Sequence, residues 1–169
     1  MFQRIGSASL AALLPALALA SGAPAPAFAQ AACGGPAGRA RIWINVDRVR
    51  DSNGLIAVTV YPDNPRKFLA KRGALYVVRV PAKQGRTRVC VNLPSTGVYG
   101  FGIYHDMDGD RGFDRTGLGL PAEAYGFSNN PAVIFGLPSF SSVRLNVPRT
   151  NMWTTIRLKY PQGPKQNRA

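Results

Sequence analysis

Hydrophobic and polar residues alternate along most of the chain beyond residue 40, and this period of two predicts β-strands. The clearest example is residues 41–47, in which Ile42, Ile44 and Val46 share one face. Residues typical of turns, mainly Gly, Pro, Asn and Asp, separate one apolar run from the next. Strands are expected at residues 41–47, 55–61, 74–81, 86–93, 98–105, 142–147 and 151–160.

Seven such strands with little helical pattern predict an all-β domain. The favoured fold is a seven-stranded antiparallel sandwich of two sheets, which closes a core without helices. A small β-barrel is the alternative. Residues 66–70 are expected to form one helical turn, whereas residues 106–141 have no periodic pattern. A loop that long inside a compact domain is typically functional, or it contains an element that the pattern does not reveal.

The first 29 residues have the pattern of a secretory signal peptide. Arg4 supplies the positive start, residues 10–20 form a short apolar stretch, and residues 27–29 (Ala-Phe-Ala) form a small-x-small cleavage site. We therefore expect an exported protein, periplasmic or extracellular. Its parts would be a signal peptide at 1–29, a lead-in at 30–40, a β-sandwich domain at 41–160 and a flexible basic tail at 161–169.

Two cysteines, Cys33 and Cys90, are present in the chain. Cysteines of exported proteins most often pair, so a Cys33–Cys90 disulfide is expected. It would tie the lead-in to a central strand. With one histidine and two cysteines, the chain lacks the four His and Cys ligands of a structural zinc site.

The chain is strongly basic, with 21 Lys and Arg against 8 Asp and Glu and a formal net charge of +13. Basic residues two positions apart project from one strand face, which is either a solvated surface or a site for polyanions. An exported protein meets little nucleic acid, so anionic envelope components, such as lipopolysaccharide phosphates or a membrane surface, are the expected partners. The candidate residues for this basic surface are Arg41, Arg86, Arg88, Arg157 and Lys159.

Four aspartates follow the strand expected at 98–105, namely Asp106, Asp108, Asp110 and Asp114. Their relative positions 1, 3, 5 and 9 are carboxylate positions of a calcium-binding loop. Arg111 stands at position 6, where such loops have Gly, and the bidentate Glu of position 12 is missing. Two interpretations stay open. One is a weak calcium site, and the other is a hairpin end whose aspartates cap their own backbone amides, with neighbouring arginines offsetting the negative charge.

His105 precedes these aspartates and shares a strand face with apolar residues, which favours a buried structural role. The alternative is a hydrolase centred on His105, paired with Asp106 and one of several serines. The chain has no Gly-x-Ser-x-Gly motif, and adjacent strand residues point to opposite faces. The candidate serines are Ser128, Ser139, Ser141 and Ser142.

Residues 104–130 have a more specific pattern, running His-Asp-Met-Asp-Gly-Asp and later Gly-Leu-Pro-Ala-Glu-Ala-Tyr-Gly-Phe-Ser-Asn. This pattern resembles the bacterial domain-of-unknown-function 2141 family, specifically over residues 97–147 and more loosely over 41–96. The resemblance implies an exported sandwich of the immunoglobulin or transthyretin type, with no assigned activity. Its motif residues are His105, Pro121, Glu123, Tyr125, Gly126, Phe127, Ser128 and Asn129. The function we expect is a non-enzymatic envelope module that binds an unidentified ligand.

Overall fold

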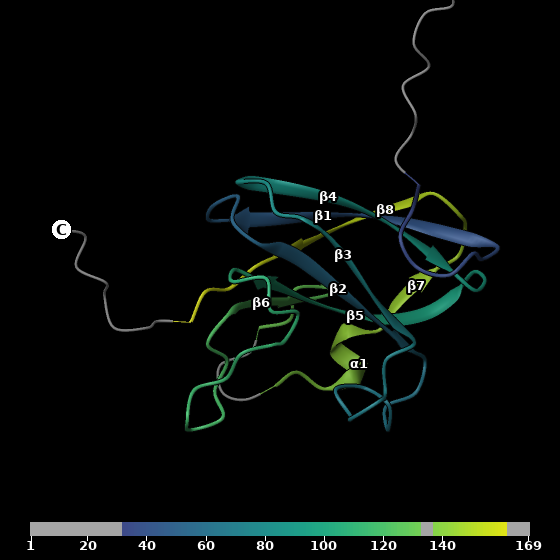
Figure 1. The fold of residues 1–169 in the computed structure, drawn as a ribbon. Coiled ribbons are helices and arrows are strands. Elements are labelled where there is room, and N and C mark those ends of the chain that lie inside the picture. The colour runs from purple at the N-terminus through teal and green to yellow at the C-terminus, as the bar shows by residue number, and fades with distance from the viewer. Residues whose placement is uncertain (1–31, 133–136, 162–169) are drawn as a thin grey trace, which may run out of the picture. The chain divides into compact units, whose positions relative to one another are not determined.

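The computed structural model describes residues 32–132 and 137–161, so the expected signal peptide and nearly all of the expected tail lie outside the described residues. Eight strands and one short helix follow one another along this part of the chain (Figure 1). They are β1 (Ala40–Val49), β2 (Leu55–Pro62), β3 (Tyr76–Pro81), β4 (Gly85–Leu93), β5 (Gly97–Asp106), β6 (Ala124–Phe127), α1 (Phe140–Val143), β7 (Leu145–Val147) and β8 (Met152–Arg157).

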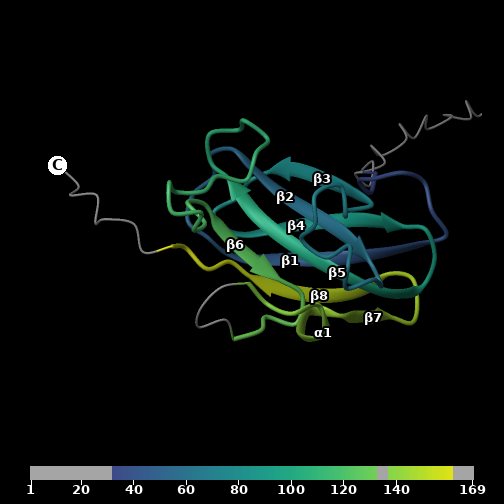
Figure 2. The same cartoon turned by 90° about the horizontal axis from the view of Figure 1, so that it is seen from below.

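The strands form two facing sheets, which confirms the all-β sandwich and excludes the barrel. One sheet has three strands in the order β4-β1-β8, and the other has five, in the order β3-β2-β5-β6 with β7 beside β5. Figures 1 and 2 show the two layers from the side and from below. The sandwich is not wholly antiparallel as predicted, because β8 runs parallel to β1.

The core lies between the two sheets and is built from the inward side chains of each. Ile42, Ile44 and Val46 are fully buried, as the alternation along β1 predicts. They pack with inward residues of the five-stranded sheet, including Ile56, Val58, Val60, Phe101 and Ile103. Burying such branched side chains stabilises the domain by about 1.5–3 kcal/mol per residue.

The outer faces of the two sheets differ in how far other parts of the chain cover them. Strand β5 is buried on both faces, since every residue from Tyr99 to Asp106 is buried. Its outer face is covered by α1 and by the connection between β2 and β3, where Phe68 packs against Phe127 and Phe140. On the three-stranded sheet, β1 instead alternates between buried and accessible residues. The outer face of that sheet is therefore left for solvent or a ligand.

Two parts of the sequence prediction need correction. Residues 142–147 were expected to form a strand, but Ser142 and Val143 belong to α1 and only Leu145–Val147 pairs with β5. Residues 106–141 were expected to be one long loop, but Ala124–Phe127 forms β6 and pairs with β5. Both elements are shorter than the window in which a period can be recognised. The expected turn at 66–70 forms consecutive hydrogen-bonded turns without an assigned helix.

The expected disulfide is present between Cys33 and Cys90, whose Cα atoms are 4.6 Å apart. Backbone hydrogen bonds of Gly34 with Cys90 and Asn92 hold the same segment along the edge of β4. A side chain at Gly34 would collide with Val78, so only glycine allows this approach. The described part of the lead-in is thus attached to the sandwich. No helix in the described ranges is long and apolar enough to span a bilayer.

Candidate functional site

Asp106 begins the acidic loop at the end of β5 and is fully buried. Its Oδ1 accepts the backbone N–H of Gly109 at 2.8 Å, and its Oδ2 accepts that of Arg111 at 3.0 Å. Arg111 has a φ of +69°, the left-handed conformation that glycine supplies at this position of calcium loops. The carboxylate of Asp106 therefore holds the turn in which the other aspartates lie.

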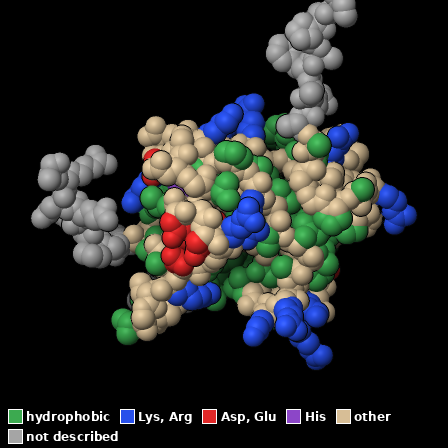
Figure 3. All heavy atoms as spheres, in the orientation of Figure 1, with side chains coloured by type: hydrophobic (Ala, Val, Ile, Leu, Met, Phe, Trp, Pro, Cys, Tyr) green, Lys and Arg blue, Asp and Glu red, His purple; other side chains and the backbone are tan. Residues whose placement is uncertain are grey.

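The remaining aspartates of the loop lie in the solvent. Asp108 caps the N–H of Asp110, and Asp110 caps the N–H of Gly112, as the hairpin interpretation predicts. Each has a further carboxylate oxygen, and atoms of Asp108, Asp110 and Asp114 lie within 4.8 Å of one another. In Figure 3 most of the red side-chain atoms on the visible face gather in one patch. Three carboxylates so close together repel one another unless a proton or cation binds.

Glu123, which follows the acidic loop in sequence, contacts that loop from outside it. Its Oε1 accepts the N–H of Met107 and its Oε2 the N–H of Asp114, so this carboxylate folds back onto the loop. Glu123, Asp106 and Asp108 offer a second group of oxygens within 4.8 Å of one another. Burial raises the pKa of Glu123 to about 7, and the nearby carboxylates of Asp106 and Asp114 add to this shift. The two backbone hydrogen bonds act in the opposite direction. The pKa of Asp114 is raised as well, by partial desolvation of its carboxylate within the loop and then by the negative charges of Asp110, Asp108 and Asp106.

In the hairpin interpretation, neighbouring arginines would offset the charge of the aspartates, and the candidates are Arg111 and Arg115. Neither forms an ion pair with any described residue. Arg115 stacks on Phe113 and donates to the Gly119 carbonyl oxygen. The carbonyl of Arg111 accepts hydrogen bonds from Arg79 and Tyr104. The carboxylates of the loop are thus left without a cationic side chain of their own, which favours an external cation.

His105 has the buried structural role. Its ring is inaccessible to solvent, and Nε2 donates to the carbonyl oxygen of Asn53 at 2.8 Å because a carbonyl only accepts. In that tautomer Nδ1 accepts the O–H of Tyr160 at 3.0 Å. No serine or aspartate side chain is within hydrogen-bonding distance of the ring among the described residues. The geometry gives no support to a hydrolase centred on His105.

The later part of the motif is structural. Tyr125, Gly126 and Phe127 lie in β6, where a side chain at Gly126 would meet the carbonyl oxygen of Arg157 at 2.7 Å. Ser128 accepts the N–H of Phe101 and donates to the carbonyl of Val143. Two further motif residues contact the backbone. Pro121 forms an isolated β-bridge with Arg115, and the side-chain amide of Asn129 donates to the carbonyls of Ser142 and Arg144.

The structure brings together only some of the residues expected to form the basic surface. Arg41 and Arg88 project from the outer face of the three-stranded sheet, together with Arg157, and none pairs with an acid in the described ranges. Arg86 is paired with Asp47 at 2.5 Å, and this lowers the pKa of Asp47. Lys159 donates to the Pro131 carbonyl at 3.0 Å, so its ammonium group is directed to the segment after β6.

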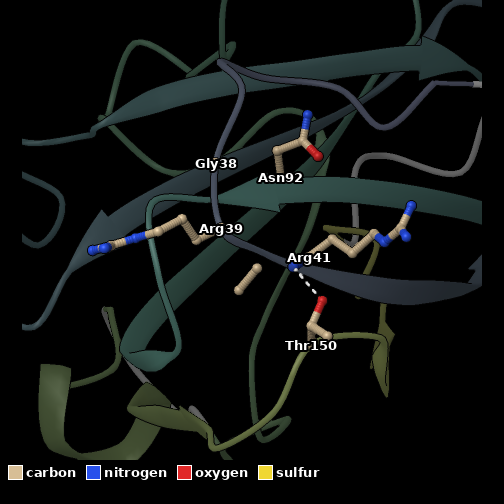
Figure 4. A pocket seen from close by; sticks show the side chains of 6 residues that line it. Gly38, Arg39, Arg41, Asn92 and Thr150 are labelled. Carbon is tan, nitrogen blue, oxygen red and sulfur yellow. Dashed lines mark hydrogen bonds between the residues drawn. The ribbon is translucent and has the colours of Figure 1, made fainter.

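A shallow polar pocket lies where β1 begins, lined by Gly38, Arg39, Ala40, Arg41, Asn92 and Thr150. Basic residues two positions apart were expected to project from one strand face, but Figure 4 shows the side chains of Arg39 and Arg41 extending in opposite directions. Arg39 precedes β1, so strand alternation does not govern it. Arg41 is fixed by its backbone N–H, which donates to the Thr150 hydroxyl.

Two tryptophans far apart in sequence meet on the same outer face. The parallel pairing of β1 and β8 places Trp43 directly opposite Trp153. Their rings stack with centroids 5.2 Å apart and an interplanar angle of 13°. Strand alternation places each tryptophan beside basic residues, but only the pairing of β1 with β8 joins them.

A family model described as "Uncharacterized protein conserved in bacteria (DUF2141)" matches residues 44–155. No curated protein and no solved structure gives a match. The matched range contains the acidic loop, together with Arg86, Arg88 and Trp153, whereas Arg41, Trp43, Arg157 and Lys159 lie outside it.

Proposed function

The chain belongs to the DUF2141 family of bacterial proteins, and we propose that it is an exported, non-enzymatic binding module that holds envelope polyanions on the outer face of its three-stranded sheet. The observation that carries this proposal is the unpaired charge of Arg41 and Arg88, which project from neighbouring strands. Asp47, the acid on this face, is already paired with Arg86. The face therefore keeps a net positive charge.

Arginine suits this role because its planar guanidinium group binds phosphate, sulfate or carboxylate through two parallel hydrogen bonds. A flat sheet face also admits an extended polymer, which an enclosed pocket would not. Lipopolysaccharide phosphates and an anionic membrane surface are the polyanions of the compartment that the signal-peptide pattern predicts. Nucleic acid is not expected there.

Replacing Arg41 and Arg88 together by Ser is expected to lower the salt concentration at which the protein elutes from heparin. Attraction between exposed charges is screened beyond about 10 Å at 0.1 M salt, so retention should fall steeply with added salt. The control is the replacement of Arg66 and Lys67 by Ser, which removes the same charge from the β2–β3 connection on the opposite side of the sandwich (Figure 1). Equal elution of the two double variants would contradict a specific basic face.

A second candidate function is calcium binding by the acidic loop, and the position of Glu123 is the observation that favours it. Two groups of carboxylates could supply oxygen ligands: Asp106, Asp108 and the buried Glu123 form one, and Asp108, Asp110 and Asp114 form the other, so that Asp108 is common to both. Calcium accepts six to eight oxygens, so backbone carbonyls and water would complete the set. We expect weak binding, on the order of 10⁻⁴–10⁻³ M, as in extracellular modules.

Millimolar calcium is expected to raise the Tm and to protect the acidic loop from proteolysis, more strongly at pH 8 than at pH 5.5. Glu123 loses its proton near pH 4.5 when unfolded and near pH 7 when folded, so without calcium the stability falls as the pH rises between these values. Calcium binds the ionised carboxylate, so its stabilising effect should grow with pH. Asp108→Asn with Asp110→Asn should abolish that effect, whereas Asp51→Asn, in the turn after β1, should keep it. An unchanged Tm and an unchanged cleavage pattern would leave the loop as a self-capped hairpin end.

A further inference from the structure

Trp153 stacks one ring face on Trp43, and no other aromatic ring among the described residues stacks on its second face. The cross-strand row on the outer face runs from Cys90 through Trp43 to Trp153. Trp43 has a neighbour on each side, whereas Trp153 has one, because β8 is the last strand in the order β4-β1-β8. Trp153 is accordingly 52% exposed although its ring stacks on Trp43.

The surroundings of this ring are polar and positively charged. Arg41 lies one row from the tryptophan pair and Arg157 two rows away in the other direction, with Asn45 and Thr155 in between. Rows of outward side chains on a strand are about 6.7 Å apart, so Arg41 and Arg157 lie on either side of the indole along the strand direction. Among the residues that the structure describes, no further large apolar side chain accompanies the indoles on the outward positions of these three strands, as insertion into lipid would require.

We propose that the polyanion is an anionic polysaccharide, with a sugar ring stacked on the second ring face of Trp153 and its acidic groups bound by Arg41 and Arg157. This inference rests on the proposed function and adds the chemical class of the ligand. The C–H groups of a sugar ring lie flat against an aromatic face, and sulfate, phosphate or carboxylate groups bind guanidinium groups. A polyanion without rings would use the arginines alone.

Stacking on Trp43 also pre-organises the Trp153 side chain for ligand binding. Packing against Trp43 holds the Trp153 indole upright on the sheet, so little side-chain freedom is lost on binding. Trp43 is itself enclosed between Trp153 and the Cys33–Cys90 disulfide, which fixes the base of the pair. Rigid aromatic side chains of this kind give contact area at a low entropic cost.

The test compares size-defined heparin oligosaccharides with inorganic polyphosphate, which carries charge but no sugar rings. The chain has two tryptophans, both in this pair, so intrinsic tryptophan fluorescence reports this face alone. We expect Trp153→Ala to weaken heparin binding about tenfold and to leave polyphosphate binding unchanged. Trp153→Phe should retain part of the affinity for heparin. Leu118→Ala removes a side chain that is 87% exposed in the loop after Asp114, and it should change neither affinity.

The outcomes separate this inference from the function on which it rests. If Trp153→Ala changes neither affinity, or weakens both equally, the polysaccharide assignment is wrong and the polyanion face stands. If wild-type protein binds neither probe at low salt, both proposals fail. Vesicles that contain anionic phospholipid provide a further arm. A blue shift of the tryptophan emission with vesicles, without any response to heparin, would assign the face to a lipid surface instead.

Discussion

Replacing Cys33 and Cys90 together by Ala is expected to lower the free energy of unfolding by about 4 kcal/mol. The bond joins residues 57 positions apart, so its loss returns considerable conformational entropy to the unfolded chain. The folded state loses order too, because the bond pins the segment that pairs with the edge of β4. The measurement is equilibrium unfolding in urea. It gives the midpoint of the transition, which should shift, and separately the slope of the unfolding free energy against urea concentration.

Ala is the matched replacement because Cys90 is buried, and a serine hydroxyl there would add a desolvation cost of its own. The wild-type protein under reducing conditions should show the same shift as the double variant. A loss of less than about 1 kcal/mol in both would mean that the unfolded chain gains little freedom when the bond is absent.

His105→Ala is expected to destabilise the domain by about 3 kcal/mol while leaving heparin binding intact. The imidazole is fully buried, so its removal leaves a cavity. It also leaves the Asn53 carbonyl and the Tyr160 hydroxyl without their partner. The ring thereby joins the turn after β1, strand β5 and the chain after β8. Thermal unfolding and heparin elution measure the two effects separately.

Tyr160→Phe is the control for this result, because it keeps the ring and removes only the hydroxyl that donates to His105. The same hydroxyl accepts the backbone N–H of Arg50, so we expect the variant to cost about 2 kcal/mol, which is the usual contribution of two hydrogen bonds. A His105→Ala variant that kept its full stability but lost binding would contradict the structural role and place the imidazole in the ligand site.

The acidic loop and the basic face are chemically opposite sites on separate elements. The loop follows β5 in the five-stranded sheet, whereas the arginines and tryptophans belong to the three-stranded sheet. The calcium and polyanion predictions can therefore be tested independently. Asp108→Asn with Asp110→Asn should leave heparin elution almost unchanged, and this serves as an internal control for both series.

Strand positions and the buried face of β1 could be predicted from the sequence because each depends on local spacing. Ile42, Ile44 and Val46 alternate with accessible residues, so one face had to be buried whatever the partner strand. The disulfide followed from cysteine count and export. Strand β6 could not be predicted in this way. With four residues it contains too few positions to show a period, and it exists because β5 offers an edge to pair with.

The sequence by itself determined the all-β class, the acidic spacing and the arginines at alternate strand positions, because neighbours along the chain decide these features. Tertiary structure alone decided what those residues face. Glu123 meets the acidic loop only because the chain returns to pair β6 with β5, and Trp43 meets Trp153 only because β8 lies parallel to β1. Contacts between residues so far apart depend on which strands become neighbours, and local pattern does not determine that choice.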